Sequence, residues 1–144
     1  MDKSFIYKQH LFKTSRLVIS DVRLLYQAQP DEKVNLLSRT ITLLSPKVTK
    51  SLPPYFQKIL TLENADDLFK QVISESRCFA VHQTELNTII GFILIYELEE
   101  EAAHIGYLLG EDYWGQGYAS EFLNALIVWC KENTKISTLF AGVG

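Results

Sequence analysis

The second half of the chain combines apolar strand patterns with one long amphipathic helix pattern. Residues 89–96 are almost continuously apolar, which is typical of a central strand covered on both faces. Residues 102–109 predict the next strand. Apolar residues at spacings of three and four predict a helix over 115–131, and a last strand follows over 136–143. Because a strand, a helix and a strand in this order form a crossover, we expect the strands 102–109 and 136–143 to be parallel.

The first half of the chain consists mainly of helical patterns. The expected elements are a strand over 10–19, helices over 22–29, 31–44 and 61–74, and a hairpin of strands 77–82 and 88–97. Asp21 is placed to cap the first helix, and Pro30 ends it. Three prolines within 45–54 predict a loop. Because the earlier strands join through short turns, we expect an α/β (α+β) fold with a mixed, mostly antiparallel sheet flanked by helices.

Composition places the chain among globular proteins of one domain. The 144 residues are 47% hydrophobic and 22% charged, and the net charge is -3. The acidic balance argues against a nucleic-acid partner, and no apolar run approaches the roughly 18 residues of a membrane span. The start of the chain lacks the apolar segment of a signal peptide, and Cys78 and Cys130 have no metal or redox spacing. We expect a cytoplasmic protein with no metal and no membrane partner.

The clearest candidate chemistry lies in the turn between the strand 102–109 and the long helix. This turn contains two glycines and an alanine and reads WGQGYA over 114–119. The first N–H groups of a helix have no partner inside it, and the helix dipole places partial positive charge there. Small residues let a phosphate approach these amides. The turn predicts a site for a phosphate-bearing ligand; the alternative is a tight connection whose glycines serve only the turn.

Two common phosphate-binding motifs do not fit this turn. A P-loop requires Lys and Ser/Thr after its last glycine, where this chain has Tyr118 and Ala119. A dinucleotide fingerprint requires an acidic residue at the tip of the next strand. The chain has no acid over 140–142, so this motif fits poorly.

A third motif fits. Residues 103–121, AHIGYLLGEDYWGQGYASE, resemble the central motif of the GCN5-related N-acetyltransferases (GNAT). The resemblance is to the branch of the ribosomal-protein-alanine and spermidine N-acetyltransferases. The family motif is Gln/Arg-x-x-Gly-x-Gly/Ala, whose fourth and sixth positions are matched by Gly117 and Ala119. Trp114 stands at the first position, which removes one polar contact to the pyrophosphate.

The resemblance extends over almost the whole chain. Residues 14–19 resemble this branch's first strand, and 48–54 resemble its loop between the first two helices. It implies a single acyl-CoA N-acyltransferase-like domain over 1–144 that lacks the family's usual C-terminal strands. If the natural protein ends here, an unpaired strand edge is exposed, and either a homodimer or strand exchange could cover it.

The family uses acetyl-CoA as cosubstrate, without a metal. In the family, the pantetheine arm pairs with the strand before the turn, and the diphosphate rests on the amides of the turn. By position, the implied cofactor-binding residues are Tyr107, Leu108, Leu109, Trp114, Gly115, Gln116, Gly117, Tyr118, Ala119 and Ser120. Gly106 is expected to mark a bulge that redirects the strand.

Direct attack of an amine on the thioester requires a base that removes a proton from the amine. The candidates are Glu97, Glu101 and His104, which precede or begin the cofactor strand. Four acids within 97–101 would repel one another, which tends to raise the pKa of a partly buried member, and they would attract a cationic amine. The alternative is a solvated acidic turn. Histidine titrates near neutral pH, and a packed or exposed role for His104 stays open.

Three classes of function remain open. The first is an N-acetyltransferase that acts on a primary amine, either a protein N-terminus or a small polyamine-like molecule. The second is an acyl-CoA-binding module without catalysis, and the third is a structural partner subunit. The acceptor cannot be named from the sequence, because acceptor loops vary independently of the strand and turn that hold the cofactor.

Overall fold

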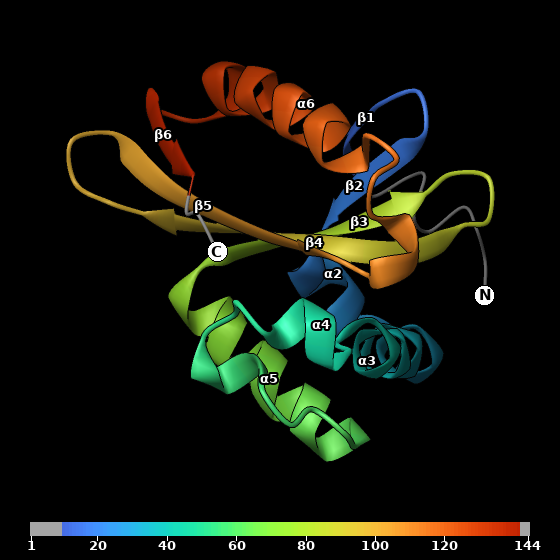
Figure 1. Ribbon diagram of the computed structural model, residues 1–144. Coiled ribbons are helices and arrows are strands. Elements are labelled where there is room, and N and C mark those ends of the chain that lie inside the picture. Colours follow the sequence, from blue (N-terminus) through green and yellow to red (C-terminus); the bar gives the residue numbers. More distant parts are fainter. Residues whose placement is uncertain (1–9, 142–144) are drawn as a thin grey trace.

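A six-stranded sheet lies between one long helix and a layer of shorter helices in the computed structural model, which describes residues 10–141 (Figure 1). The strands are β1 (His10–Lys13), β2 (Leu17–Asp21), β3 (Arg77–Gln83), β4 (Thr88–Glu97), β5 (Ala102–Leu109) and β6 (Thr138–Ala141). The helices are α2 (Val22–Tyr26), α3 (Pro30–Leu43), α4 (Pro46–Thr49), α5 (Leu62–Glu75) and α6 (Tyr118–Asn133), with short 3-10 turns η1 (Pro54–Phe56) and η2 (Glu111–Tyr113).

The strands follow one another across the sheet in sequence order. Every neighbouring pair is antiparallel except β5 and β6, which are parallel and joined through α6. The expected crossover and the mixed, mostly antiparallel fold are therefore confirmed. The parallel pairing runs from Ala102 opposite Thr138 to Ile105 opposite Ala141.

The prediction of one strand over 10–19 is wrong, because this segment is a hairpin of β1 and β2. The chain reverses at 14–16, where the Thr14 N–H donates to the Leu17 carbonyl at 2.9 Å and the Leu17 N–H donates to Thr14 Oγ1 at 3.1 Å. Hydrogen bonds of a threonine hydroxyl to nearby backbone stabilise such turns without glycine or proline.

Other boundaries also differ from the predictions. The loop predicted over 45–54 contains the short helix α4, which begins at Pro46. Helix α6 begins at Tyr118 rather than at Gly115, because Gly115 and Gly117 have φ values of 72° and 81°, in the left-handed region. Strand β6 begins at Thr138 rather than at residue 136, and the predicted strand end at 143 lies outside the described residues.

The bulge predicted at Gly106 is absent from the pairing of β4 with β5. Their register runs without a shift from Gly91 opposite Leu109 to Glu97 opposite Ala103. A register shift instead occurs between β3 and β4, next to Val81. The pairing of β5 with β4 is therefore regular through Gly106.

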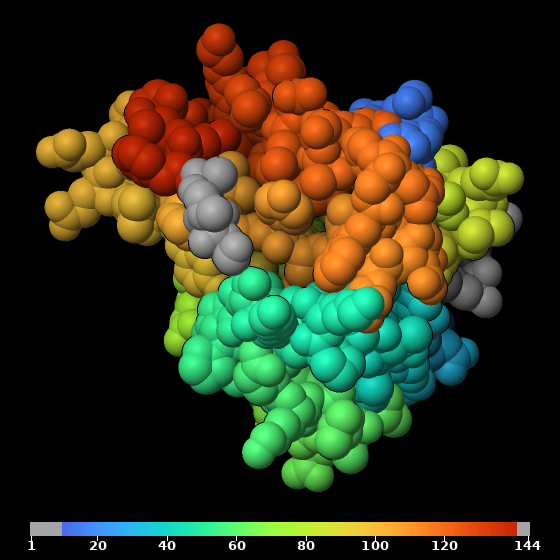
Figure 2. Space-filling model, viewed as in Figure 1, coloured from blue at the N-terminus to red at the C-terminus, as the bar shows by residue number. Residues whose placement is uncertain are grey.

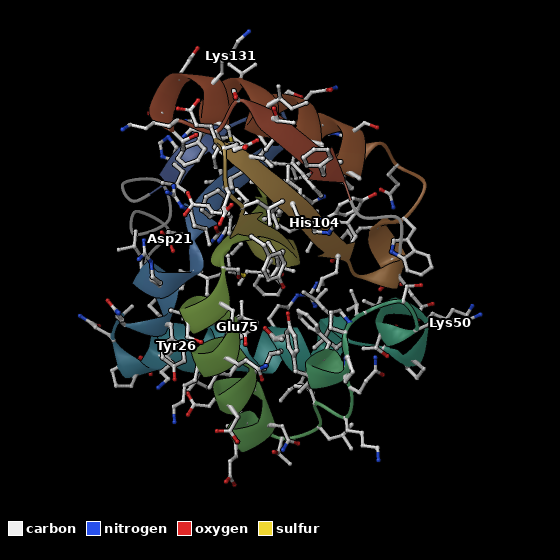
Figure 3. All side chains as sticks on the ribbon, turned by 90° about the vertical axis from the view of Figure 1, so that its left-hand side faces the viewer. Asp21, Tyr26, Lys50, Glu75, His104 and Lys131 are labelled. Carbon is white, nitrogen blue, oxygen red and sulfur yellow. The ribbon has the colours of Figure 1, made fainter. Side chains whose placement is uncertain are left out.

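Side chains of the sheet pack alternately into two hydrophobic cores. Leu94 and Leu108 belong to the core shared with α2, α3 and α5, whereas Ile93 and Leu109 belong to the core under α6, which also contains Phe122. Figure 3 shows the sheet between these helical layers. The expectation that β4 is covered on both faces is confirmed. No helix within residues 10–141 combines the length and the apolar character needed to cross a membrane.

Candidate active site

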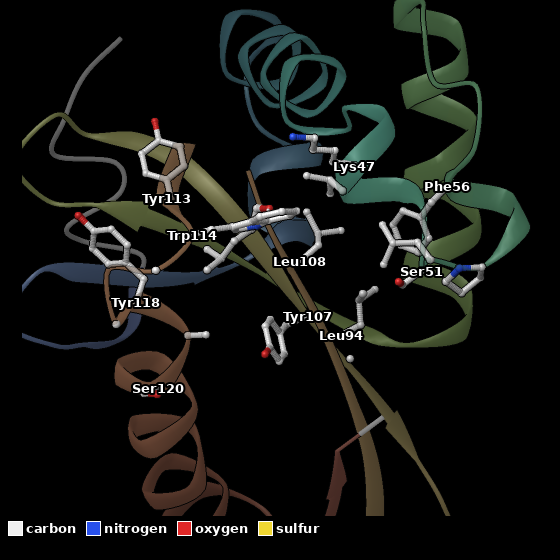
Figure 4. A pocket seen from close by; sticks show the side chains of 18 of the residues that line it. Lys47, Ser51, Phe56, Leu94, Tyr107, Leu108, Tyr113, Trp114, Tyr118 and Ser120 are labelled. Carbon is white, nitrogen blue, oxygen red and sulfur yellow. The ribbon is translucent and has the colours of Figure 1, made fainter. Parts of the chain in front are cut away.

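A pocket of about 920 Å³ opens where β5 leads into the turn before α6. One wall consists of Lys47, Val48, Ser51, Leu52, Pro53 and Phe56, from α4 and the segment that follows it. The floor consists of residues of β4 and β5, and the second wall consists of 113–115 and 117–120. The space-filling view shows the surface hollowed between the segment of α4 and the segment that begins α6 (Figure 2). Figure 4 shows the side chains around the pocket.

The pocket brings together almost all the residues predicted to bind the cofactor. Its lining includes Tyr107, Leu108, Leu109, Trp114, Gly115, Gly117, Tyr118, Ala119 and Ser120. Gln116 does not line it. The Gln116 carbonyl accepts from Arg16 Nη1 at 3.0 Å, and its side-chain amide donates to the Asp112 carbonyl at 2.8 Å. Gln116 therefore turns its polar groups away from the pocket.

The N-terminal end of α6 faces the pocket without a cap. Its N-cap residue is Gly117, and no side chain among the described residues caps this end. The Glu121 N–H makes the first bond of the helix, to the Gly117 carbonyl at 3.1 Å. The preceding N–H groups of Tyr118, Ala119 and Ser120 consequently have no partner inside the helix. The partial positive charge of the helix dipole is concentrated at these three pocket-lining residues.

Backbone groups of β5 alternate between β4 and the opposite side. The Gly110 N–H donates to the Ile90 carbonyl at 2.9 Å, so the backbone groups of Gly110 face β4. By the alternation of an antiparallel pair, those of Leu108 also face β4, whereas those of Tyr107 and Leu109 face the side of β6. The Leu109 carbonyl accepts the Trp114 indole N–H at 2.8 Å. Leu108 therefore contributes its side chain to the pocket, and the backbone groups of Tyr107 face the side of β6.

Of the three predicted catalytic residues, only His104 lines the pocket. Glu97 is exposed and forms an ion pair with Arg77, with 2.7 Å between its Oε1 and the guanidinium. Glu101 is exposed in the turn between β4 and β5, where its backbone carbonyl accepts from the Ser137 N–H at 2.7 Å. The acidic residues of this turn are therefore on the surface, as in the alternative interpretation of the cluster.

Tyr96 is a pocket residue that the sequence did not single out, because it ends the apolar run assigned to the core. Its ring centroid lies 6.3 Å from that of His104, and its hydroxyl lies 2.6 Å from the Tyr55 hydroxyl. Burial and the hydrogen bond with Tyr55 raise the pKa of Tyr96 well above its usual range. Tyr96 therefore stays protonated at neutral pH, and its hydroxyl shares a hydrogen bond with that of Tyr55.

The charged groups of the pocket are few. Among the described residues of the lining, Lys47 carries a positive charge and no side chain is a carboxylate. Lys47 is largely exposed, and its Nζ lies 3.9 Å from Glu111 Oε2 outside the lining. Within residues 10–141, no group of three His, Cys, Asp or Glu side chains is arranged to hold a metal ion.

Comparison with known proteins identifies the class to which this fold and pocket belong. Residues 20–143 match the family model of the acetyltransferase (GNAT) domain, and the chain belongs to this family. No curated protein matches the sequence.

Solved structures share the fold. An acetyltransferase of the GNAT family from Bacillus anthracis is 20% identical, with a TM-score of 0.68 over 90% of this chain and 70% of its own. RimL, a ribosomal-protein acetyltransferase in complex with coenzyme A, is 18% identical, with a TM-score of 0.68 over 89% of this chain and 71% of its own. The spermidine/spermine N-acetyltransferase SpeG from Vibrio cholerae is 13% identical, with a TM-score of 0.58 over 90% of this chain and 69% of its own.

Proposed function

We propose that this protein transfers an acetyl group from acetyl-CoA to a primary amine, either a protein N-terminus or a small polyamine-like molecule. The observation that carries the proposal is the uncapped N-terminal end of α6, which opens onto the pocket of a GNAT domain. The similar structure of RimL was solved in complex with coenzyme A, which supports the same cosubstrate here. In this proposal, residues 1–144 act as one acyltransferase-like domain.

The residues of the turn fit a diphosphate. The N–H groups of Tyr118, Ala119 and Ser120 would hold the phosphate oxygens, because they lack partners inside the helix. A Cβ built on Gly115 would meet no atom within 4 Å, so this face of the turn is open to a ligand. Lys47 on the opposite wall adds a positive charge, which partly replaces the polar contact that is lost with Trp114.

Strand β5 fits the extended part of the same ligand. The backbone groups of Tyr107 face the side of β6, and the Tyr107 ring packs against Phe122 of α6 at a centroid distance of 5.5 Å. This residue would pair with the amide groups of pantetheine. Gln116 was predicted to bind the cofactor, but it does not line the pocket. We propose instead that it stabilises the turn through its carbonyl, which accepts a hydrogen bond from Arg16.

Acetyl-CoA supplies an activated acetyl group as a thioester. His104 is the side chain we propose to accept the proton of the attacking amine, directly or through a water molecule, because it is the candidate base that lines the pocket. As the nitrogen–carbon bond forms and the carbon–sulfur bond breaks, the thiolate leaves with the electron pair. Tyr96 stays protonated beside His104, where its hydroxyl is hydrogen-bonded to that of Tyr55. Glu97 and Glu101 would act at most from the surface, by attracting a cationic acceptor.

The experiment is an assay of thiol release from acetyl-CoA with a panel of peptides, polyamines and aminoglycosides. We expect turnover with at least one amine of the panel. His104→Ala should lower kcat by roughly 10²–10⁴-fold and leave the Kd of acetyl-CoA unchanged, since general-base catalysis contributes about this much. His10→Ala is the matched control, because His10 lies on β1 and does not line the pocket.

Two outcomes would contradict this function. Calorimetry that detects CoA binding, together with silence across the whole amine panel, would support an acyl-CoA-binding module without catalysis. The absence of any heat of CoA binding would support a structural partner subunit instead.

A further inference from the structure

Arg16, in the turn between β1 and β2, lies directly behind the turn that begins α6. Its Nε donates to Glu121 Oε1 at 2.7 Å, and its backbone N–H donates to Glu121 Oε2 at 3.0 Å. Its Nη1 donates to the Gln116 carbonyl at 3.0 Å. Its guanidinium carbon lies 4.2 Å from the centre of the Tyr118 ring. One side chain from the start of the chain thus contacts three positions in and beside the turn.

Glu121 fixes Arg16 in this place. The Thr14 hydroxyl donates a hydrogen bond to the same carboxylate. Burial alone would raise the pKa of Glu121, but the hydrogen bonds from Thr14 and Arg16 outweigh it and lower the pKa. The carboxylate is therefore charged at neutral pH and holds the guanidinium with a charge-assisted bond.

The bond from Arg16 to Gln116 determines which way one peptide plane points. Gln116 lies between Gly115 and Gly117, whose φ values of 72° and 81° show that both occupy the left-handed region. Glycine adopts many other conformations almost as readily, so the two glycines alone do not determine the backbone conformation of the turn. In a trans peptide the carbonyl and the following N–H point in opposite directions. A guanidinium that holds the Gln116 carbonyl on the rear side therefore directs the Gly117 N–H toward the pocket side.

Arg16 also packs closely against the turn. A Cβ built on Gly117 would lie 3.5 Å from Arg16 Nη2, so the guanidinium occupies the space behind this glycine. Arg16 itself does not line the pocket. An effect of this residue on the ligand would therefore act through the backbone of the turn.

We propose that Arg16, held by Glu121, is a positioning residue that orients the Gln116–Gly117 peptide for the diphosphate of coenzyme A. This inference rests on the proposed function, because it takes the turn as the diphosphate site. Arg16 forms an ion pair with Glu121, and its side chain is 42% exposed. Exposed ion pairs of this kind contribute little to the free energy of unfolding. Removal of Arg16 should consequently affect the diphosphate more than the fold.

The experiment compares two ligands that differ in the diphosphate. Kd is measured for CoA by calorimetry and for pantetheine, which has no diphosphate, by ligand-observed NMR. We expect Arg16→Ala to raise the Kd of CoA roughly tenfold, as expected when the Gly117 N–H no longer donates a hydrogen bond to the charged diphosphate. The Kd of pantetheine should stay within about twofold of the wild-type value, because pantetheine lacks the diphosphate that the turn would bind.

Further variants separate positioning from a general structural role. Arg16→Lys should give an intermediate Kd for CoA, because an ammonium group lacks the planar fork that reaches both Glu121 and Gln116. Arg16→Ala combined with Glu121→Gln should bind CoA no more weakly than Arg16→Ala alone, because the two residues act as a unit. Arg23→Ala is the matched control, since Arg23 forms an ion pair with Asp21 at 3.0 Å and does not contact the turn. It should change neither Kd.

Three results would overturn the inference. Arg16→Ala could bind CoA as tightly as the wild type, or it could lose CoA and pantetheine equally; in both cases a wild type that binds CoA leaves the proposed function standing. If the wild type binds no CoA, the proposed function fails and the inference fails with it. Thermal unfolding monitors the fold of each variant, and Arg16→Lys and Glu121→Gln decide the question if Arg16→Ala does not fold.

Discussion

His82 is a titratable side chain enclosed in the sheet, away from the pocket. It is 2% exposed on β3, and its Nε2 lies 3.1 Å from the Ser20 hydroxyl on the neighbouring strand. Burial lowers the pKa of His82 to about 4, from an ordinary value of 6.5. The folded protein therefore keeps this imidazole neutral at pH values where an unfolded chain protonates it.

This difference predicts a loss of stability in acid. As the pH falls through 6.5, His82 binds a proton in the unfolded chain, whereas in the folded state it binds one only near pH 4. The contribution of His82 is present above pH 6.5 and is lost between 6.5 and 4, to a total of about 3 kcal/mol. Urea unfolding at several pH values measures this slope. His82→Gln should flatten this slope; equal slopes in the wild type and His82→Gln would contradict the prediction.

Helix α6 has a buried side and an exposed side, as two adjacent residues show. Leu126 is 0% exposed under α6, whereas Ile127 is 53% exposed on its outer surface. Leu126 belongs to the same core as Phe122 and Ile93, so α6 is held against the sheet by this face. The orientation of α6 also decides where its N-terminal end meets the pocket.

We expect Leu126→Ala to lower the free energy of unfolding by about 2–5 kcal/mol, because it leaves a cavity in the core. Ile127→Ala on the same helix should change it by less than about 0.5 kcal/mol. Denaturant titrations of the two variants provide the measurement. Similar losses in both would show that the outer face of α6 is covered in solution.

Long elements with regular apolar spacing could be predicted from the sequence alone. Strand β5, helix α5 and the crossover through α6 lie close to the predicted positions, because each buries a face whose pattern repeats over many residues. The hairpin of β1 and β2 could not be predicted, because its turn depends on the Thr14 hydroxyl rather than on glycine or proline. The short helix α4 lies within a segment whose prolines suggested only a loop.

Only the part of the candidate site formed by residues adjacent in sequence could be predicted. Residues adjacent in sequence, such as those of the turn before α6, stay adjacent in space, so their motif suffices to place them. The contact of Arg16 with Glu121 joins residues far apart along the chain and depends on the packing of β1 and β2 beside α6. The acidic residues near Glu101 come just before β5 in the sequence. They nevertheless lie outside the pocket, because they belong to the turn between β4 and β5.

The pocket lies between the two helical layers of the molecule. The segment 47–56 belongs to one layer and the beginning of α6 to the other, with β5 between them. The Ser45 hydroxyl donates to Glu111 Oε1 at 2.6 Å, and Arg39 Nη2 donates to the Tyr113 hydroxyl at 2.8 Å. These hydrogen bonds join the two layers beside the pocket, so a ligand bound there should stabilise both layers.

Hydrogen exchange with and without CoA tests this arrangement. Binding stabilises the folded state in proportion to ligand concentration, and the amides that touch the ligand gain the most protection. We expect the strongest protection over 113–120, clear protection over 104–109 and weaker protection over 47–56. Helix α5, which does not line the pocket, serves as the internal control. Uniform protection, or protection confined to 47–56, would contradict this placement of the ligand.

The two tryptophans of the chain lie in different surroundings. Trp114 lines the pocket and is 48% exposed, whereas Trp129 packs against Phe12 and Phe79 at centroid distances of 5.9 Å and 5.3 Å. A molecule that enters the pocket changes the environment of one indole and leaves the other untouched. The protein therefore contains its own fluorescent reporter of occupancy together with a built-in reference, and no dye needs to be attached.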